Sequence, residues 1–195
     1  MQVEVMLTGV GGQGIQLAAK TLALGVVVEG RQAMMCGHYA GAMRGGQTDA
    51  SVVVADRNLR ALPILPSAWS AMVMSQEYWE TTRVRIRPGG VVVVNSDIVP
   101  DELPAQGLTV LPFPAQQLAS QAGAPLGAAL VLLGAFCSLT GLCSTEGLVT
   151  AMKRLVPPYR TQHVLGNEAA IRAGAAVTGP LDKAPWEPLT AGSPS

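Results

Sequence analysis

The sequence has few charged side chains. Asp, Glu, Lys and Arg make up only 13% of its 195 residues, about half the usual share, and the formal net charge is zero. A protein that binds nucleic acid needs a basic face to neutralise phosphates, so we do not expect a nucleic-acid partner. A surface so poor in charge suggests instead that partner proteins cover part of it.

Cysteine and histidine are also scarce. The chain contains Cys36, Cys137 and Cys143, and its two histidines are His38 and His163. An odd, scattered set of cysteines gives no disulfide framework, and neither residue type has the close spacing of a zinc or iron–sulfur site. We therefore expect no metal bound by this chain, and reduced thiols in a cytoplasmic protein.

Several well-known functional signals are missing. There is no Gly-x-Ser-x-Gly motif, no Gly-Lys-Ser/Thr phosphate loop and no basic start of a signal peptide in residues 1–7. The sequence therefore indicates no catalytic residue. Residues 103–145 carry no charge and include the apolar run 126–142, which is close to the length of a membrane span. Repeated Gly and Ala, with Ser138 and Thr140, favour a helix buried between protein layers, so we expect no membrane contact.

Hydrophobic residues make up 49% of the chain, and their spacing predicts alternating strands and helices. The expected strands are 2–7, 32–36, 49–55, 71–74, 91–94 and 108–113. The expected helices are 15–28, 76–87, 126–142, 145–155 and 161–173, with turns or loops at 8–14, 37–46 and 88–90 and a break at Pro157-Pro158.

Such alternation predicts a Rossmann-like, three-layer α/β/α sandwich with a mostly parallel central sheet. No helix separates the loop 37–46 from the strand 49–55. We therefore expect that strand to be antiparallel and the sheet to be mixed. Residues 1–177 would form the domain, and the Pro- and Gly-rich residues 178–195 a C-terminal tail.

A glycine-rich turn follows the first expected strand and opens the first expected helix. Its sequence, Gly9-Val-Gly11-Gly12-Gln13-Gly14, fits the pattern G-x-G-x-x-G in the context where that pattern has meaning. The glycines permit a sharp turn, a close approach of backbone to ligand, and tight helix–strand packing. Free N–H groups at the helix start would face an anion, and Gln13 would add its amide. The alternative is a tight turn that needs glycine for geometry and binds nothing.

A second glycine-rich segment spans residues 37–46. If the strand before it runs parallel to the first strand, both glycine segments lie at the carboxyl edge of the sheet and share a crevice. Arg44 would bring a forked cationic donor suited to phosphate or carboxylate, and Gly45 and Gly46 would let the chain bend around the ligand. A surface arginine in a turn is the open alternative. Tyr39 is a further candidate, although it could equally be a packing residue.

The dinucleotide interpretation has a specific weakness. A nicotinamide-binding domain carries Asp or Glu about 20 residues after the turn, at the end of the second strand. Residues 32–37 contain no acid, and Glu29 precedes the strand. A stand-alone NAD(P)-binding oxidoreductase stays open, as does a non-enzymatic ligand-binding or scaffold protein of the same fold.

At these residues the chain resembles the gamma subunit of 2-oxoacid:ferredoxin oxidoreductases, the group that acts on pyruvate, 2-oxoglutarate, 2-oxoisovalerate or indolepyruvate. Residues 9–14 are similar to the family's Gly-x-Gly-Gly-Gln-Gly, residues 39–46 to its Tyr-Gly-Pro-Glu-x-Arg-Gly-Gly loop, and residues 167–174 to its Asn-x-x-Ala-x-x-x-Gly helix end. Pro88-Gly89-Gly90 and Leu133-Gly134-Ala135 are also similar, and the resemblance spans residues 3–175.

The chain departs from the family pattern at four positions. Ala40, Gly41 and Ala42 stand where the family has Gly, Pro and Glu, and Ala129 stands in place of an Asn. An acid and an amide that the family uses for substrate or partner contacts are therefore missing.

The resemblance implies a subunit that is inactive alone. Its complex oxidatively decarboxylates a 2-oxoacid with coenzyme A, giving acyl-CoA, carbon dioxide and reduced ferredoxin. Thiamine diphosphate is implied between alpha and beta subunits and iron–sulfur clusters in partner subunits, with a ferredoxin-like delta subunit as a further candidate partner. Coenzyme A is the implied ligand of the gamma chain, and a homodimer is a candidate state in isolation. The resemblance does not name the 2-oxoacid.

Overall fold

The computed structural model describes residues 2–39, 45–56, 59, 64–99 and 107–183, and all structural statements below refer to these. Its strands form one six-stranded sheet in the order β2-β3-β1-β4-β5-β6. The strands are β1 (Gln2–Val10), β2 (Gln32–Tyr39), β3 (Gln47–Ala55), β4 (Ala68–Val73), β5 (Ile86–Asn95) and β6 (Thr109–Phe113). β3 is antiparallel to both of its neighbours and the other pairs are parallel. The predicted mixed, mostly parallel sheet with an antiparallel strand at 49–55 is confirmed.

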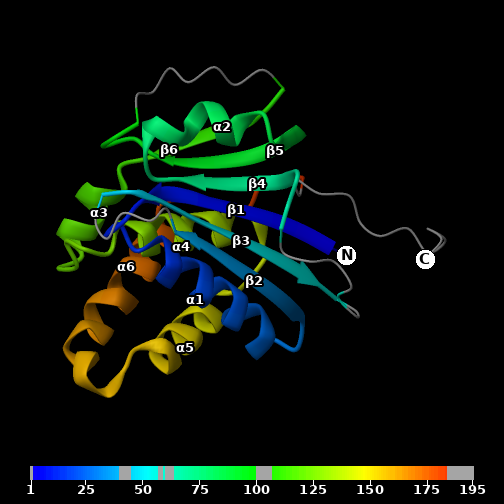
Figure 1. Ribbon diagram of the computed structural model, residues 1–195. Helices are drawn as coiled ribbons and strands as arrows, with labels where there is room; N and C mark the ends of the chain where they lie inside the picture. The colour runs from blue at the N-terminus through cyan, green and yellow to red at the C-terminus, as the bar shows by residue number, and fades with distance from the viewer. Residues whose placement is uncertain (1, 40–44, 57–58, 60–63, 100–106, 184–195) are drawn as a thin grey trace.

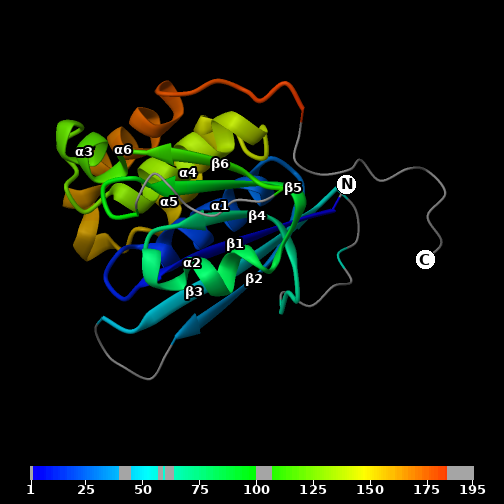
Figure 2. The same ribbon diagram turned by 90° about the horizontal axis from the view of Figure 1, so that it is seen from above.

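Helices cover the sheet unequally. They are α1 (Ile15–Val28), η1 (Gln76–Tyr78), α2 (Trp79–Arg83), α3 (Ala115–Gln121), α4 (Ala128–Thr140), α5 (Thr145–Leu155), η2 (Pro158–His163) and α6 (Val164–Ala176). Figure 1 shows α1, α4, α5 and α6 on one side of the sheet and α2 on the other. Figure 2, turned by 90°, shows β2 and β3 at one edge of the sheet and β5 and β6 toward the other.

The alternation of side chains along β1 explains the two cores. Val5 and Leu7 point into the large core shared with the helices α1 and α3 to α6, whereas Met6 points into a smaller core closed by Trp79 of α2. Because successive residues of a strand face opposite sides, one strand supplies both layers of packing. The three-layer α/β/α architecture is confirmed, with one thick helical layer and one thin one.

The uncharged segment before residue 142 forms the buried helix α4. Nearly all of its residues are buried, and it packs against α6 and α3. Two glycines permit the closest approach: a Cβ at Gly134 would overlap the Ile171 carbonyl, and a Cβ at Gly174 would overlap the Val131 carbonyl. The interpretation as a helix buried in protein is confirmed. None of the helices in the described ranges is long and apolar enough to cross a membrane.

Several boundaries differ from the sequence-based expectation, among them the last helix, which spans Val164–Ala176 and not 161–173. β2 continues to Tyr39, beyond the predicted end at residue 36, because Gly37, His38 and Tyr39 pair with the start of β3. The predicted helix 76–87 is much shorter: after η1 and α2 the chain turns at Val84 and enters β5 at Ile86. The polar pattern that suggested a long helix belongs instead to a short crossover.

Two further features differ from the expectation: the predicted turn at Pro88-Gly89-Gly90 lies inside a strand, and α3 was not predicted. The Pro-Gly-Gly turn is a bulge inside β5, where Gly89 has a φ of +81° and the β4–β5 register shifts. α3 was missed because its N-terminal cap comes from a distant part of the chain. The Asp97 carboxylate accepts hydrogen bonds from the backbone N–H groups of Gln116 and Gln117, at 2.7 and 3.0 Å.

The C-terminal boundary stays partly a prediction. α6 ends at Ala176, next to the expected domain limit of 177. Beyond it, the Leu181 N–H donates to the Leu139 carbonyl at 2.8 Å, and the Leu181 side chain packs on the large core, so the first tail residues lie on the domain. Residues 184–195 of the predicted tail lie outside the described residues.

Candidate functional site

The glycine turn connects the end of β1 to the start of α1. β1 ends at Val10, and α1 begins after Gly14, which adopts a left-handed conformation with a φ of +85°. Gly12 has a φ of +102° with open space where a Cβ would stand, so glycine suits both positions. A Cβ at Gly9 would lie 2.5 Å from the Gln13 side-chain oxygen. The geometry of the turn therefore favours glycine at these positions, whether or not a ligand binds there.

The Gln13 side chain is hydrogen-bonded within the protein. Its Oε1 accepts a hydrogen bond from the Val10 N–H at 2.9 Å, and its Nε2 donates to the Met74 carbonyl at 3.0 Å. One end of the side chain thus closes the turn, and the other joins it to the residue that follows β4. In this structure Gln13 is a brace that holds the glycine turn against the neighbouring strand, and its predicted contact with a ligand stays a prediction.

The two glycine segments meet. The Gly11 N–H donates to the Gly46 carbonyl at 2.8 Å, and a Cβ placed on Gly11 would lie 3.4 Å from the Gly45 nitrogen. β2 runs parallel to β1 because β3 is antiparallel to both, so the loop after β2 returns at the carboxyl edge. Arg44 and the side chain of Tyr39 lie outside the described residues, as do Ala40, Gly41 and Ala42. Binding by Gly9, Gly11, Gly12, Gly14, Gly45 and Gly46, and by Tyr39 and Arg44, stays a prediction.

This edge of the sheet is a topological switch point. From β1 the chain leaves to α1 on the thick side, and from the adjacent parallel strand β4 it leaves to η1 and α2 on the thin side. In open α/β sheets a crevice forms where neighbouring connections diverge in this way, outside the carboxyl ends of the strands. The glycine turn, Gly45 and Gly46 all lie at that edge, where the fold favours ligand binding.

The first turn of α1 offers unpaired backbone donors. Its first intrahelical bond runs from the Ala18 N–H to the Gly14 carbonyl, and no side chain caps the helix. The N–H groups of Ile15, Gln16 and Leu17 therefore have no partner within the helix, and the helix dipole adds partial positive charge there. This is the usual arrangement for holding a phosphate or carboxylate.

Ala129 lies directly beside this helix start. A Cβ at Gly14 would be 3.5 Å from the Ala129 Cβ, and Ala129 is buried at the beginning of α4. The family's Asn at this position would place an amide against the glycine turn. The substitution therefore removes a polar group from the site rather than from a remote surface.

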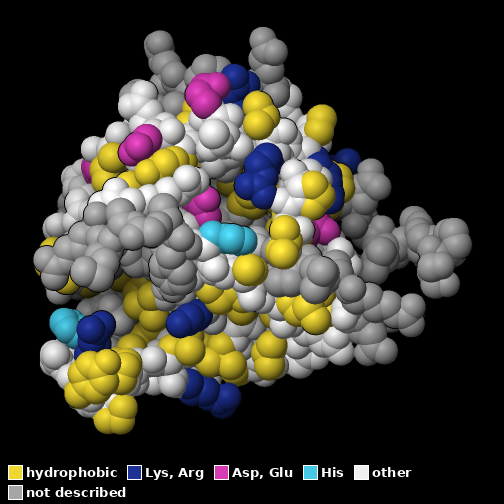
Figure 3. Space-filling view, in the orientation of Figure 1, with side chains coloured by type: hydrophobic (Ala, Val, Ile, Leu, Met, Phe, Trp, Pro, Cys, Tyr) yellow, Lys and Arg dark blue, Asp and Glu magenta, His cyan; other side chains and the backbone are white. Residues whose placement is uncertain are grey.

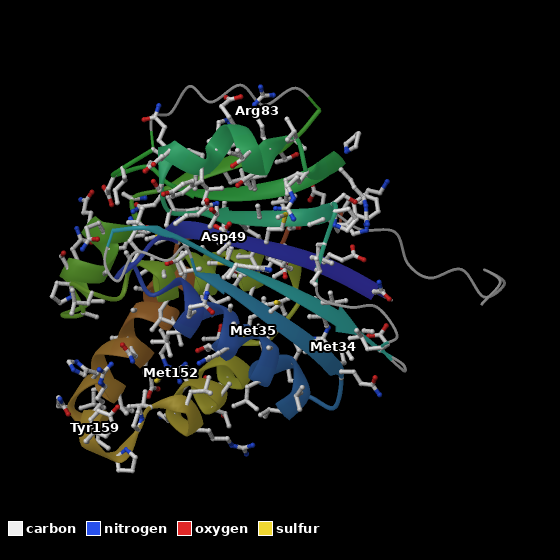
Figure 4. All side chains as sticks on the ribbon, in the orientation of Figure 1. Met34, Met35, Asp49, Arg83, Met152 and Tyr159 are labelled. Atoms are coloured by element: carbon white, nitrogen blue, oxygen red, sulfur yellow. The ribbon has the colours of Figure 1, made fainter. Side chains whose placement is uncertain are left out.

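An acid also lies beside the end of β1, on the opposite face of the sheet. The Asp49 carboxylate accepts hydrogen bonds from the Thr8 hydroxyl at 2.6 Å and the Gln47 amide at 2.7 Å. It lines a hollow of about 400 Å³ under α2 together with Tyr78 and Arg85. Because its oxygens already accept from two side chains, Asp49 holds β1 and β3 together at this edge (Figure 4). Sequence reasoning did not identify this hollow.

The cysteines are poor candidates for cluster ligands. Burial raises the pKa of the Cys143 thiol to about 12 and that of Cys137 well above its usual value. No group of three or more His, Cys, Asp or Glu side chains in the described ranges could hold a metal ion. The donors of these residues therefore do not fit an iron–sulfur cluster, since its iron needs several thiolates placed together.

Comparison with known proteins decides the family. The sequence model for pyruvate ferredoxin/flavodoxin oxidoreductase matches residues 4–177.

The chain belongs to the pyruvate ferredoxin/flavodoxin oxidoreductase family.

Among its relatives is the 2-oxoglutarate synthase subunit KorC of Methanocaldococcus jannaschii, 31% identical over 80% of this chain and 85% of that protein. The indolepyruvate oxidoreductase subunit IorB of Pyrococcus horikoshii is 26% identical over 80% of this chain and 88% of its own length. The family thus includes relatives named for different 2-oxoacids.

Solved structures of the family have the same fold. The keto/oxoacid ferredoxin oxidoreductase gamma subunit of Geobacter sulfurreducens superposes with a TM-score of 0.77 at 27% identity, covering 89% of this chain and 94% of that one. The 2-oxoglutarate:ferredoxin oxidoreductase of Magnetococcus marinus, solved with 2-oxoglutarate, coenzyme A and succinyl-CoA, has a TM-score of 0.78 at 21% identity and covers 31% of its chain. The resemblance to the gamma subunit of 2-oxoacid:ferredoxin oxidoreductases is confirmed.

The family patterns have different roles in the structure. The pattern residues of the oxidoreductase's glycine turn and Gly45-Gly46 lie together at the switch point. The pattern glycines Gly134, in Leu133-Gly134-Ala135, and Gly174 permit the close contact between α4 and α6. The same family signature therefore contains both a candidate binding edge and a packing device.

Proposed function

We propose that this oxidoreductase subunit binds coenzyme A at the switch point and presents it to a partner subunit that decarboxylates the 2-oxoacid. The product would be acyl-CoA, with the electrons passed to a ferredoxin-type acceptor. The observation that carries the proposal is the meeting of the two glycine segments, where Gly11 bonds to Gly46 at 2.8 Å beside the free amides of α1.

The chemistry of this edge suits an anion. In the described residues, no side chain accepts a hydrogen bond from the backbone N–H groups at the helix start, and the only side-chain amide of the turn is occupied within the protein. Coenzyme A carries a diphosphate and a ribose phosphate, which are the groups that such amides bind. Arg44, one residue before Gly45, would add a bidentate cation to this site.

The redox cofactors belong elsewhere in the proposed complex. Thiamine diphosphate would activate the 2-oxoacid between alpha and beta subunits, and iron–sulfur clusters in partner subunits would accept the electrons. The buried, high-pKa thiols Cys137 and Cys143 are unsuited to holding a cluster. In this assignment the chain binds and orients coenzyme A, excludes water from its phosphates and contacts its partners. It would have no turnover by itself.

The test uses the chain assembled with its alpha and beta partners. Gly11→Val fills the space between the two glycine segments, because even a Cβ there lies 3.4 Å from the Gly45 nitrogen. We expect the KM for coenzyme A to rise at least about tenfold, the loss of roughly one charge-assisted hydrogen bond, with the KM for the 2-oxoacid unchanged. Arg44→Ala should act in the same direction. An unchanged KM for coenzyme A in both variants would contradict the proposal.

A thermal-shift comparison separates coenzyme A from a nicotinamide cofactor. A ligand at 100 times its Kd stabilises the folded state by about 2.7 kcal/mol. Stabilisation of the full chain by NADH and not by coenzyme A would favour the stand-alone dehydrogenase instead.

A further inference from the structure

A groove on the outer surface of the thick helical layer adjoins the candidate site. A hollow of about 400 Å³ lies between α1, the end of α5, η2 and α6, and a second of about 310 Å³ shares Leu126, His163 and Asn167 with it. The two therefore form one continuous depression, which we call the α1–α6 groove. Its lining includes Leu17, Lys20 and Arg160 in addition to the three shared residues.

The groove is positively charged. In the described part of the chain, neither Lys20 nor Arg160 forms an ion pair, and the Arg160 guanidinium stands 5.6 Å from the Tyr159 ring centre. Two other cations of α5 and α6 are paired: Lys153 with Glu168 at 2.6 Å, and Arg172 with Glu146. No acid lines either hollow.

Figure 3 shows a part of the surface without acidic side chains. The Asp and Glu side chains in this view lie in its upper half, among Lys and Arg side chains. At the lower left, over α5 and α6, basic and hydrophobic side chains and a histidine lie together with no acid among them. Unpaired cations beside exposed apolar side chains such as Leu126, 86% exposed, favour a ligand that is both anionic and partly apolar.

The groove begins where the glycine turn ends. Gly14 lies beside Ala129 at the start of α4, since a Cβ added to Gly14 would be 3.5 Å from the Ala129 Cβ, and Leu126 and Gly127 immediately precede that helix. Leu17 lies three residues after Gly14 and therefore on the same face of α1. Lys20 is six residues after Gly14, about 9 Å farther along the helix axis. An elongated ligand with one anionic group at the start of α1 can therefore extend along the groove to Lys20.

We propose that the α1–α6 groove holds the phosphate-bearing adenosine end of coenzyme A, with Lys20 and Arg160 binding its phosphates and Leu17 and Leu126 contacting its apolar parts. This proposal rests on the proposed function and assigns the orientation of the ligand. The Asn167 amide, which belongs to the family's late helix motif, lies within the groove and offers a hydrogen bond to the adenosine.

Charge reversal tests the proposal in the assembled complex. We expect Lys20→Glu and Arg160→Glu each to raise the KM for coenzyme A about tenfold, because a phosphate would meet a like charge in place of an opposite one. The KM for the 2-oxoacid should not change. Arg83→Glu is the matched control: Arg83 is on α2, across the sheet from the groove, and Figure 4 shows it far from Tyr159.

Dephospho-CoA, which lacks the ribose phosphate, shows which phosphate is bound. If the charge-reversal variants raise the KM for dephospho-CoA less than the KM for coenzyme A, Lys20 and Arg160 bind the ribose phosphate. If they raise both KM values equally, Lys20 and Arg160 bind the diphosphate. Both outcomes support the groove.

Three results would overturn the proposal. One is a KM for coenzyme A within about twofold of wild type in both reversal variants, as expected for the Arg83 control. Another is dissociation of the partner subunits in gel filtration, which would make the groove a subunit interface. In the third, added inorganic phosphate raises the KM for coenzyme A by the same factor in wild type and in both variants. That result would mean that the groove does not bind the phosphates of coenzyme A. If Gly11→Val still raises the KM for coenzyme A, only the groove assignment fails. If it does not, the proposed function fails with it.

Discussion

Replacing Gly174 by alanine should destabilise the protein through the contact between α4 and α6. The added Cβ would overlap the Val131 carbonyl oxygen and lie 2.7 Å from its carbonyl carbon and 3.0 Å from the Ala135 nitrogen. These atoms are backbone, so no side chain can rotate away, and the two helices must separate.

The magnitude follows from two opposing effects. Overpacking of a well-packed core costs about 1–3 kcal/mol, and we take the upper value because the obstacle is a helix backbone. Alanine improves on glycine in a helix interior by about 1 kcal/mol. The net loss should be about 2 kcal/mol, which for a domain of this size lowers Tm by about 4–8 °C.

Gly166→Ala is the matched control in the same helix. It gains the same helix propensity, but its Cβ would lie 3.4 Å from the Ala124 Cβ, an ordinary contact. Thermal unfolding followed by circular dichroism should therefore show Gly166→Ala at or above the wild-type Tm and Gly174→Ala well below it. Equal Tm values for the two variants would refute the argument that glycine sets the helix spacing.

Three further predictions concern a brace, an ion pair and the thiols. Gln13→Ala removes the hydrogen bond from the glycine turn to the Met74 carbonyl and the one that Gln13 accepts from Val10 within the turn. It should lower the free energy of unfolding by about 1–3 kcal/mol in urea titrations, whereas an unchanged midpoint would show that the brace is not needed. The Arg172 guanidinium lowers the pKa of Glu146, so its stabilisation is present above the unfolded-state pKa and is lost as pH falls through the lower folded value. The stability difference between wild type and Arg172→Met should therefore shrink progressively as pH falls below the ordinary glutamate pKa of about 4.3, and a difference that does not change with pH would rule the ion pair out as its cause. Burial raises the pKa of Cys143 to about 12, so at pH 8 iodoacetamide should label the partly exposed Cys36 first, as peptide mass spectrometry would show; faster labelling of Cys143 would mean that its environment opens readily.

The sequence determined the general architecture because local patterns suffice for it. The four valines of β5, the periodic apolar stripe of α1 and the uncharged run that forms α4 each match what the structure contains. The antiparallel strand β3 was also predictable, because a connection without a helix cannot return a strand in the parallel sense. The glycine turn was found for the same reason, since its pattern lies between a strand and a helix.

Local patterns did not predict the elements whose bounds depend on residues distant in the sequence. α3 is capped by Asp97, almost 20 residues earlier, and β2 is extended by pairing with a strand that follows it. The turn-forming triplet in β5 became a bulge because β4 supplies a partner on either side of it.

At the candidate site, the sequence identified the residues but not their tasks. The pattern of Gln13 is the same whether its amide binds a ligand or the Met74 carbonyl, and only the folded position of β4 shows the second. The cations Lys20 and Arg160 are 140 residues apart and belong to no motif, so nothing local connects them. Motifs encode backbone geometry within a few residues, whereas the charge of a groove is the sum of side chains that only tertiary packing brings together.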